Sequence, residues 1–134
     1  MKHILWMLAI SGTLLIAESS KLDDKTGLIW QDNQAVAEND LNYDEAQKYC
    51  KDLELDGFTD WRLPTLKEAY TIVDLTRNRP ALKNGFEIPD DSRFWTSTLF
   101  VKNPDKEAWY ISMSYGEAGP YKKGRMYHVR CVRK

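Results

Sequence analysis

The sequence lacks the short patterns that mark most catalytic and nucleotide-binding sites. It has no G-x-S-x-G turn to present a nucleophilic serine, no phosphate-cradling glycine loop and no dinucleotide-binding glycine fingerprint. His3 and His128 are its only histidines. His3 lies in an N-terminal segment that we expect to be removed, and a single imidazole cannot supply a histidine-based metal cluster. We therefore expect a protein that is not an enzyme, with no catalytic residue, no metal and no cofactor.

No hydrophobic run in the sequence is long enough to span a bilayer. The segment MKHILWMLAISGTLLIA places Lys2 before a stretch without formal charge, residues 4–16, which is shorter than the roughly 20 apolar residues of a spanning helix. A basic start, a short apolar middle and a small residue at Ala17 are typical of a secretory signal peptide. We predict that residues 1–17 are cleaved and that the product is periplasmic or secreted. The alternative is an uncleaved N-terminal anchor.

The mature sequence lacks an excess of either charge. Removal of residues 1–17 leaves 18 basic and 20 acidic residues, a net charge of −2, which argues against nucleic acid as a partner. The charges are unevenly placed, because residues 38–60 carry eight acids and two lysines whereas residues 121–134 carry six basic residues and no acid. The basic C-terminal segment can contact an anionic ligand or neutralise the acidic segment across the fold.

Cysteine is scarce, and the two cysteines, Cys50 and Cys131, are far apart in the sequence. In an exported protein an even cysteine count predicts a disulfide. A bridge across about 80 residues is expected to contribute roughly 4–5 kcal/mol in the chain-entropy model. The alternative is a reactive thiol pair, which the large separation and the missing C-x-x-C motif disfavour.

Two helices are predicted by matching start signals. Asn42 with Glu45, and Thr65 with Glu68, have the spacing of capping boxes. After each signal, apolar residues recur at helical spacing. The first apolar face comprises Tyr43, Ala46, Tyr49, Cys50 and Leu53, and the second comprises Leu66, Ala69, Tyr70 and Val73.

The remaining patterns predict strands. Residues 18–26 are polar and predict a short lead before one domain, residues 27–134. Strand patterns occupy 27–31, 94–101, 109–115 and 127–131, and a connection rich in glycine, 114–124, reads as a hairpin-like loop. The order of elements predicts an α+β fold with two helices and a small antiparallel sheet, in which the disulfide joins the first helix to the last strand.

The segment DWRLPT joins the two predicted helices. Its residues are Asp60, Trp61, Arg62, Leu63 and Pro64, followed by the helix-capping threonine. Alternation buries Trp61 and Leu63 and leaves the charged residues outside, and Pro64 keeps the preceding residue out of the helical region. We therefore assign the segment a structural role. We predict a bidentate ion pair between Arg62 and a carboxylate, either Asp60 or one from the first helix.

Several of these pieces together resemble a known family. The stretches GLIWQ, AQKYCKDLELDGFTDWRLPTLKEA, FWTST and VRCVR are similar to the Lcl C-terminal domain family, long catalogued as a domain of unknown function in exported bacterial proteins. The resemblance covers roughly residues 27–134 and implies a C-type lectin-like fold with Cys50 bridged to Cys131. It also implies a relationship to surface proteins of this family that bind sulfated polysaccharides.

The sequence departs from the calcium-dependent lectins of that wider fold. The nearest pieces to their calcium loops are IPDDSRFWTST and NPDK, in which Asp90, Asp91 and Asp105 are the candidate oxygen donors. Calcium requires 6–8 oxygen ligands in register. We therefore interpret these acids as solvated and predict no obligatory metal, although Asp90 and Asp91 remain candidates for a weak calcium site.

Aromatic and basic residues gather near the C-terminal strands. Flat aromatic faces stack on sugar rings, and lysine and arginine pair with sulfate or carboxylate groups. We expect Trp95 and Trp109 to fill the core. The candidate ligand-binding residues are Tyr110, Tyr115, Tyr121, Lys122, Lys123 and Arg125.

These residues favour a non-catalytic exported module that binds a glycan or an anionic polysaccharide, with membrane contact only through the signal peptide before cleavage. The alternative is a protein-interaction or assembly domain of the cell envelope that has no sugar ligand and forms a homo-oligomer, such as a trimer, or part of an envelope complex. An exported enzyme is the third and least favoured hypothesis.

Overall fold

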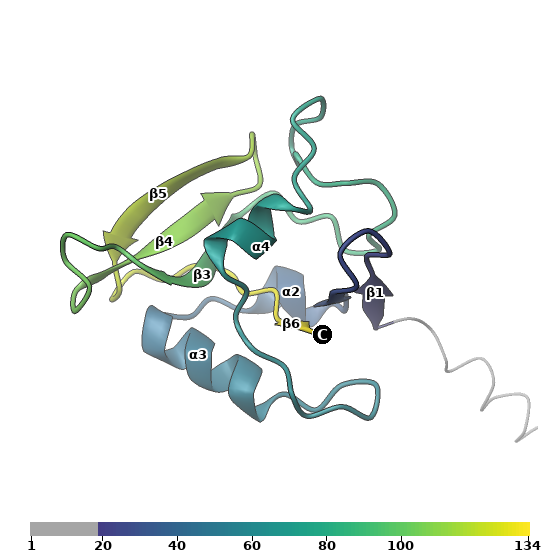
Figure 1. Ribbon diagram of the computed structural model, residues 1–134, viewed down its shortest axis with the longest axis horizontal. Helices are drawn as coiled ribbons and strands as arrows, with labels where there is room; N and C mark the ends of the chain where they lie inside the picture. The colour runs from purple at the N-terminus through teal and green to yellow at the C-terminus, as the bar shows by residue number, and fades with distance from the viewer. Residues whose placement is uncertain (1–18) are drawn as a thin grey trace, which may run out of the picture.

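The computed structural model of the protein describes residues 19–134, so the predicted signal peptide at residues 1–17 lies outside the described residues. The fold is α+β (Figure 1). Its elements are β1 (Ser20–Leu22), β2 (Ile29–Gln31), α2 (Ala35–Glu38), α3 (Tyr43–Asp52), α4 (Leu66–Tyr70), β3 (Arg93–Leu99), β4 (Glu107–Ser112), β5 (Glu117–Lys122) and β6 (Val132–Arg133). Between residues 19 and 134 no helix is long and apolar enough to cross a membrane.

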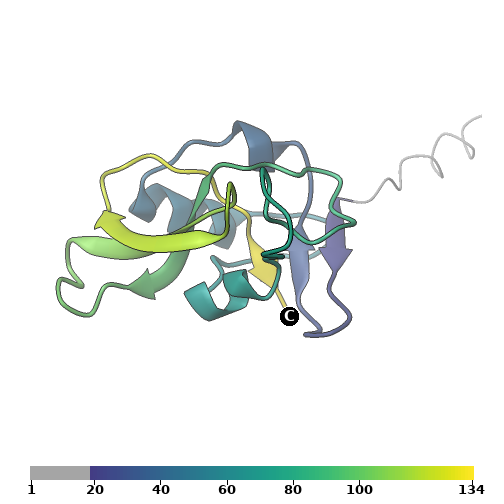
Figure 2. The same cartoon turned by 90° about the horizontal axis from the view of Figure 1, so that it is seen from above.

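The strands form two separate antiparallel sheets, ordered β1-β2-β6 and β3-β4-β5. Figure 2 shows β1 and β2 at one end of the long axis and β3, β4 and β5 towards the other. The prediction of one small sheet and two helices therefore needs correction, since the described residues hold two sheets and three helices. Residues 18–26, which were predicted to be a polar lead before the domain, contain the strand β1. In this strand Lys21 pairs with Trp30 of β2.

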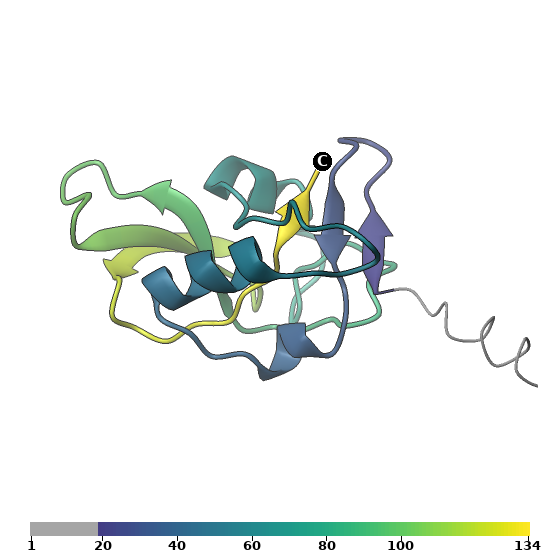
Figure 3. The same cartoon turned by 90° about the horizontal axis from the view of Figure 1, so that it is seen from below.

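The two predicted helix starts are confirmed. Asn42 and Glu45 make both hydrogen bonds of a capping box at the start of α3, and Thr65 and Glu68 do the same at the start of α4. Figure 3 shows α3 running across this side of the molecule. The predicted apolar face of α4 is wrong at Tyr70, which is exposed, because the helix ends there after one and a half turns. The additional helix, α2, is one turn long.

The predicted last strand, 127–131, is not continuous. The backbone of Tyr127 pairs with that of Leu41, and the amide of His128 donates to the carbonyl oxygen of Arg93. Only Val132–Arg133 form a strand, β6, beside β2. The segment changes partners because it crosses from the side of β3 to the other sheet. It thereby links the two sheets.

The predicted loop at 114–124 is also wrong, because Glu117–Lys122 form the edge strand β5. Gly119 lies opposite Tyr110 of β4, and Pro120 lies opposite Trp109. Proline is compatible with an edge strand, where its missing N–H can face away from the sheet. Gly119 is small enough for the tyrosine, since a Cβ atom there would come within 3.1 Å of the Tyr110 hydroxyl. Glycine and proline therefore fit this strand for specific reasons.

The core has two clusters, one on each side of β3. Phe94 belongs to the cluster with Trp30 and Ile72, whereas Trp95 belongs to the cluster around α3. Adjacent residues of a strand face opposite sides of a sheet, so β3 is buried on both faces. Trp95 is fully buried and Trp109 is half-buried, the latter with its ring 6.0 Å from that of Phe100.

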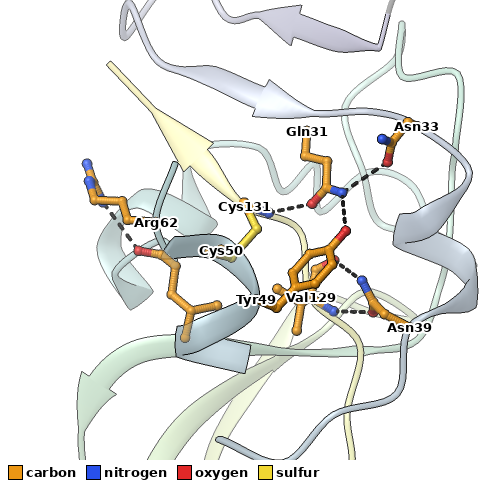
Figure 4. Close-up of a disulfide and its surroundings, with 9 residues drawn as sticks. Gln31, Asn33, Asn39, Tyr49, Cys50, Arg62, Val129 and Cys131 are labelled. Carbon is orange, nitrogen blue, oxygen red and sulfur yellow. Dashed lines mark hydrogen bonds between the residues drawn. A yellow bond between two sulfur atoms is a disulfide. The ribbon is translucent and has the colours of Figure 1, made fainter. Parts of the chain in front are cut away.

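The disulfide between Cys50 and Cys131 is present (Figure 4). It ties α3 to the residue immediately before β6, so its C-terminal anchor lies one residue outside the last strand. Buried amide groups surround it. The Gln31 side chain donates to the Tyr49 hydroxyl at 2.9 Å and accepts from the Cys131 amide at 3.0 Å. The Gln31 side chain therefore links the backbone at the disulfide to α3.

Candidate functional site

The DWRLPT segment has a structural role at the junction of the helices. Trp61, Leu63 and Pro64 are buried. The guanidinium of Arg62 donates two hydrogen bonds of 2.8 Å to the carboxylate of Glu68 in α4. The predicted bidentate contact is therefore present, but its predicted partners, Asp60 and an acid of the first helix, are wrong.

Glu68 is the better partner because the same carboxylate closes the capping box of α4. Its Oε1 atom also accepts from the Thr65 amide at 2.9 Å. The hydrogen bonds from Arg62 keep the pKa of Glu68 below its usual value, although partial burial acts in the opposite direction. The carboxylate of Asp60 instead accepts two hydrogen bonds from the guanidinium of Arg133, and the one from Nη2 to Oδ2 is 3.1 Å long. The same guanidinium lies over the ring of Phe58. All these groups have intramolecular partners, so they are poor candidates for a ligand site.

The basic and aromatic candidates at the end of β5 lie together. Tyr121 and Lys122 are the last residues of β5, and Lys123 and Arg125 lie in the turn that follows. We call these four residues the β5 surface. Tyr121 is 41% exposed, and the guanidinium of Arg125 lies 5.4 Å from the centre of its ring. An exposed ring flanked by cations can present both a stacking face and positive charge to a ligand.

Buried aromatic residues support the β5 surface from below. The ring of Tyr127 lies 6.5 Å from that of Tyr121, 5.1 Å from that of Tyr110 and 4.8 Å from that of Trp95. Tyr127 is only 6% exposed. Tyr110 is half-buried, and the guanidinium of Arg93 covers its ring at 5.0 Å. Tyr110 is thus positioned to support the surface more than to contact a ligand.

Lys123 fixes the turn after β5 to two other parts of the chain. Its carbonyl oxygen accepts from the Tyr43 amide at the start of α3, and its amide donates to the carbonyl oxygen of Lys106, both at 2.9 Å. Its ammonium group lies 5.0 Å from the centre of the Tyr43 ring. Lys106 precedes β4 and is exposed. These contacts place Lys106 beside the β5 surface.

Tyr115 does not belong to this group. It lies in the turn before β5, at the other end of that strand, and its hydroxyl accepts from Arg79 Nε at 3.2 Å. Sequence reasoning grouped it with the others because it assumed a single loop. It also missed Arg93, Tyr43 and Lys106, whose positions depend on contacts between distant segments that no local pattern signals.

The three aspartates considered as calcium ligands do not form a common site. Asp90 Oδ1 accepts from the Ser92 amide at 2.8 Å and lies 3.4 Å from His128 Nδ1. The carbonyl oxygen of Asp91 accepts from Ser114 at 3.0 Å, and Asp105 is exposed in the turn between β3 and β4. Within residues 19–134 no three His, Cys, Asp or Glu side chains gather as a metal site.

A protein-family model matches most of this chain. Residues 21–133 match the Lcl C-terminal domain. The match includes all of β1 except Ser20, and it includes the DWRLPT segment, both cysteines and the β5 surface. No curated protein matches the chain.

Proposed function

The chain belongs to the Lcl C-terminal domain family, and we propose that it is a non-catalytic exported module that binds an anionic polysaccharide through the β5 surface. The observation that carries this proposal is the arrangement of Tyr121 and Arg125 over the buried ring of Tyr127. A sugar ring stacks on the exposed tyrosine, while Lys122 and Arg125 pair with sulfate or carboxylate groups of the chain.

The positive charges around the β5 surface favour a polymeric ligand over a small one. Lys102 and Lys106 are exposed in the turn between β3 and β4, and the backbone bond from Lys123 to Lys106 brings that turn beside the surface. Asp105 and Glu107 accompany them, so the excess of positive charge is small. An extended polyanion that contacts several lysines at once gains from these dispersed charges through multivalency.

Two finer assignments accompany the proposal. The disulfide supports an oxidising compartment, either the periplasm or the extracellular space. A C-type lectin-like fold is consistent with two helices, a three-stranded antiparallel sheet and a bridge from α3 to the chain's end. Both assignments agree with a surface that binds glycans outside the cytoplasm.

Heparin-affinity chromatography with stepped salt tests the proposal. We expect the protein to be retained, and the double variant Lys122→Ala/Arg125→Ala to elute at clearly lower salt. The matched control is Lys51→Ala/Lys67→Ala, which removes two exposed charges from α3 and α4 and should elute with the wild type. Equal shifts for the two double variants would show that net charge alone governs retention, and the proposed surface would be wrong.

The edge position of β5 favours a second candidate, an assembly domain of the cell envelope. An edge strand offers unpaired backbone groups to a strand of another chain, and β5 is paired only with β4 among the described residues. Pro120 opposes such pairing because it has no N–H. Light scattering after gel filtration distinguishes the candidates, since assembly through β5 predicts an oligomer that Ala118→Pro disrupts. Ala118, like Pro120, lies at a position of β5 whose N–H side faces away from β4.

A further inference from the structure

A cleft of about 360 Å³ opens between the β1–β2 hairpin and the 83–86 loop. Lys21 and Leu22 of β1 line it, and β1 lies at the end of the molecule opposite to β5 (Figure 1). Lys21 of β1 and Lys83 of the loop bring ammonium groups to it, and Ile72 and Phe86 bring apolar surface. The volume is within the range of about 300–1,000 Å³ that is usual for small-molecule sites.

Neither lysine is fully engaged by the protein. None of the ion pairs among residues 19–134 involves Lys21, and its ammonium group lies 5.8 Å from the centre of the Phe86 ring. The ammonium group of Lys83 reaches only the carboxylate of Asp23, at 3.9 Å. That distance is beyond a hydrogen bond. Both ammonium groups thus retain donors for a ligand.

The carboxylate of Asp23 is committed elsewhere. It accepts from the Thr26 hydroxyl at 2.8 Å, within the turn of the β1–β2 hairpin. The backbone of Asp23 closes the same hairpin, since its amide donates to the carbonyl oxygen of Leu28 at 2.8 Å. Asp23 therefore fixes the shape of this wall, and its carboxylate contacts Lys83 only through the long ion pair of 3.9 Å.

The other wall of the cleft, the 83–86 loop, is fixed by contacts with buried residues. Asp32 accepts from the amides of Glu87 and Ile88 at 2.8 and 3.0 Å, and the buried guanidinium of Arg130 lies 4.6 Å from the centre of the Phe86 ring. The Lys83 amide donates to the Ile72 carbonyl oxygen at 2.9 Å. A site whose walls are fixed before binding loses less entropy when a ligand enters.

We propose that this cleft binds a carboxylate carried on a compact group with an apolar face. Lys21 and Lys83 pair with the carboxylate, and the apolar face packs on Phe86. Asn84, whose side chain is exposed at the rim, is placed to bond a hydroxyl or amide of the ligand. Asp23, Asp24 and Lys25 also line the cleft, so three lysines stand against two aspartates. This small excess of positive charge favours a monoanion over a doubly charged phosphate.

Two sources of such a carboxylate are distinguished by titrating the ¹⁵N-labelled protein with two probes. D-Glucuronate represents an acidic sugar, and N-acetyl-L-leucine represents a peptide carboxyl terminus. We expect one or both probes to shift the backbone amides of Asn84 and Gly85, and the tighter probe identifies the source. D-Glucose, which has no carboxylate, should shift neither amide. The proposal is overturned if neither acid shifts them or if glucose shifts them equally.

Variants then test the two lysines. Lys21→Met and Lys83→Met keep most of the apolar side chain and should each weaken binding at least about tenfold, the usual effect of losing one hydrogen bond to a charged group. Lys67→Met on α4, outside the cleft, and Lys122→Ala/Arg125→Ala on the β5 surface should bind as the wild type does. If Lys67→Met weakens binding as much as the cleft variants, the cleft is not the site.

Discussion

The guanidinium of Arg62 and the carboxylate of Glu68 form a two-point contact, with both N–O distances at 2.8 Å. Glu68 also closes the capping box of α4, so one carboxylate joins the DWRLPT segment to the helix that follows. The backbone of Arg62 pairs at the same time with that of Val132 beside the disulfide. Arg62 thereby connects α4 to the C-terminal strand.

This contact predicts a pH dependence. The hydrogen bonds from Arg62 lower the pKa of folded Glu68 below its usual 4.5, so ionised Glu68 stabilises the fold above that pH. The stabilisation is lost as the pH falls through the lower pKa of the folded state. Glu68→Gln should therefore reduce the difference in melting temperature between about pH 6 and about pH 3.

The exposed Glu54→Gln is the matched control and should leave that difference unchanged. Arg62→Lys should also lower the melting temperature near neutral pH by a few degrees, because lysine cannot make the two-point contact. The effect is limited to about 1 kcal/mol, since the pair is partly exposed. An unaltered melting temperature in Arg62→Lys would remove the role assigned to the contact.

The turn before β5 depends on Gly116. Its φ of +82° is unfavourable for other residues, and a Cβ atom there would lie 2.9 Å from side-chain atoms of Val73 and Leu75. Gly116→Ala should destabilise the protein by about 1–3 kcal/mol in urea denaturation. Gly124→Ala is the control, because it meets no atom within 4 Å, and should stay within about 1 kcal/mol of the wild type. Equal stabilities of the two variants would contradict the proposed strain.

The disulfide predicts a large effect of reduction. The bridge joins residues separated by 81 positions, and opening a loop of that size should reduce the free energy of unfolding by about 4–5 kcal/mol. Urea denaturation with and without reductant measures the difference, and the variant Cys50→Ala/Cys131→Ala separates loss of the bridge from other effects of the reductant. Identical midpoints for oxidised and reduced protein would show that the bridge contributes little.

A buried ion pair holds the wall of the cleft near β1. Arg130 Nη1 lies 3.2 Å from Asp32 Oδ1, and burial lowers the pKa of the guanidinium. Asp32→Ala leaves that charge without its carboxylate and should destabilise the fold by about 3–5 kcal/mol. It should also speed hydrogen exchange at the amides of Glu87 and Ile88. The exposed Asp40→Ala should do neither, and slow exchange in Asp32→Ala would show that other contacts hold the loop.

Sequence reasoning worked best for short-range features. The capping boxes of α3 and α4 depend on residues three positions apart, and such local pairs are visible in a sequence. The cysteine pairing was also accessible, because only two cysteines exist. The bidentate contact of Arg62 was expected, but a local pattern could not show that Glu68, already used by a capping box, faces Arg62.

Features that depend on long-range pairing were less accessible. Gly119 and Pro120 normally indicate a turn, but pairing with β4 places them in an edge strand. The change of partners along residues 127–133 depends on three separate segments. The cleft near β1 joins Lys21 to Lys83 across more than half of the described chain. Such sites become visible only when the distant segments are placed together.

The β5 surface is tested most directly by mapping a sulfated ligand on the protein. The ¹⁵N-labelled protein is titrated with a size-defined heparin oligosaccharide, and backbone amide shifts are followed in the wild type and in Lys122→Ala/Arg125→Ala. We expect the largest saturable shifts at residues 121–125, and at least about tenfold weaker binding in the double variant. Shifts concentrated elsewhere, or equal affinity of the two proteins, would contradict binding through the β5 surface.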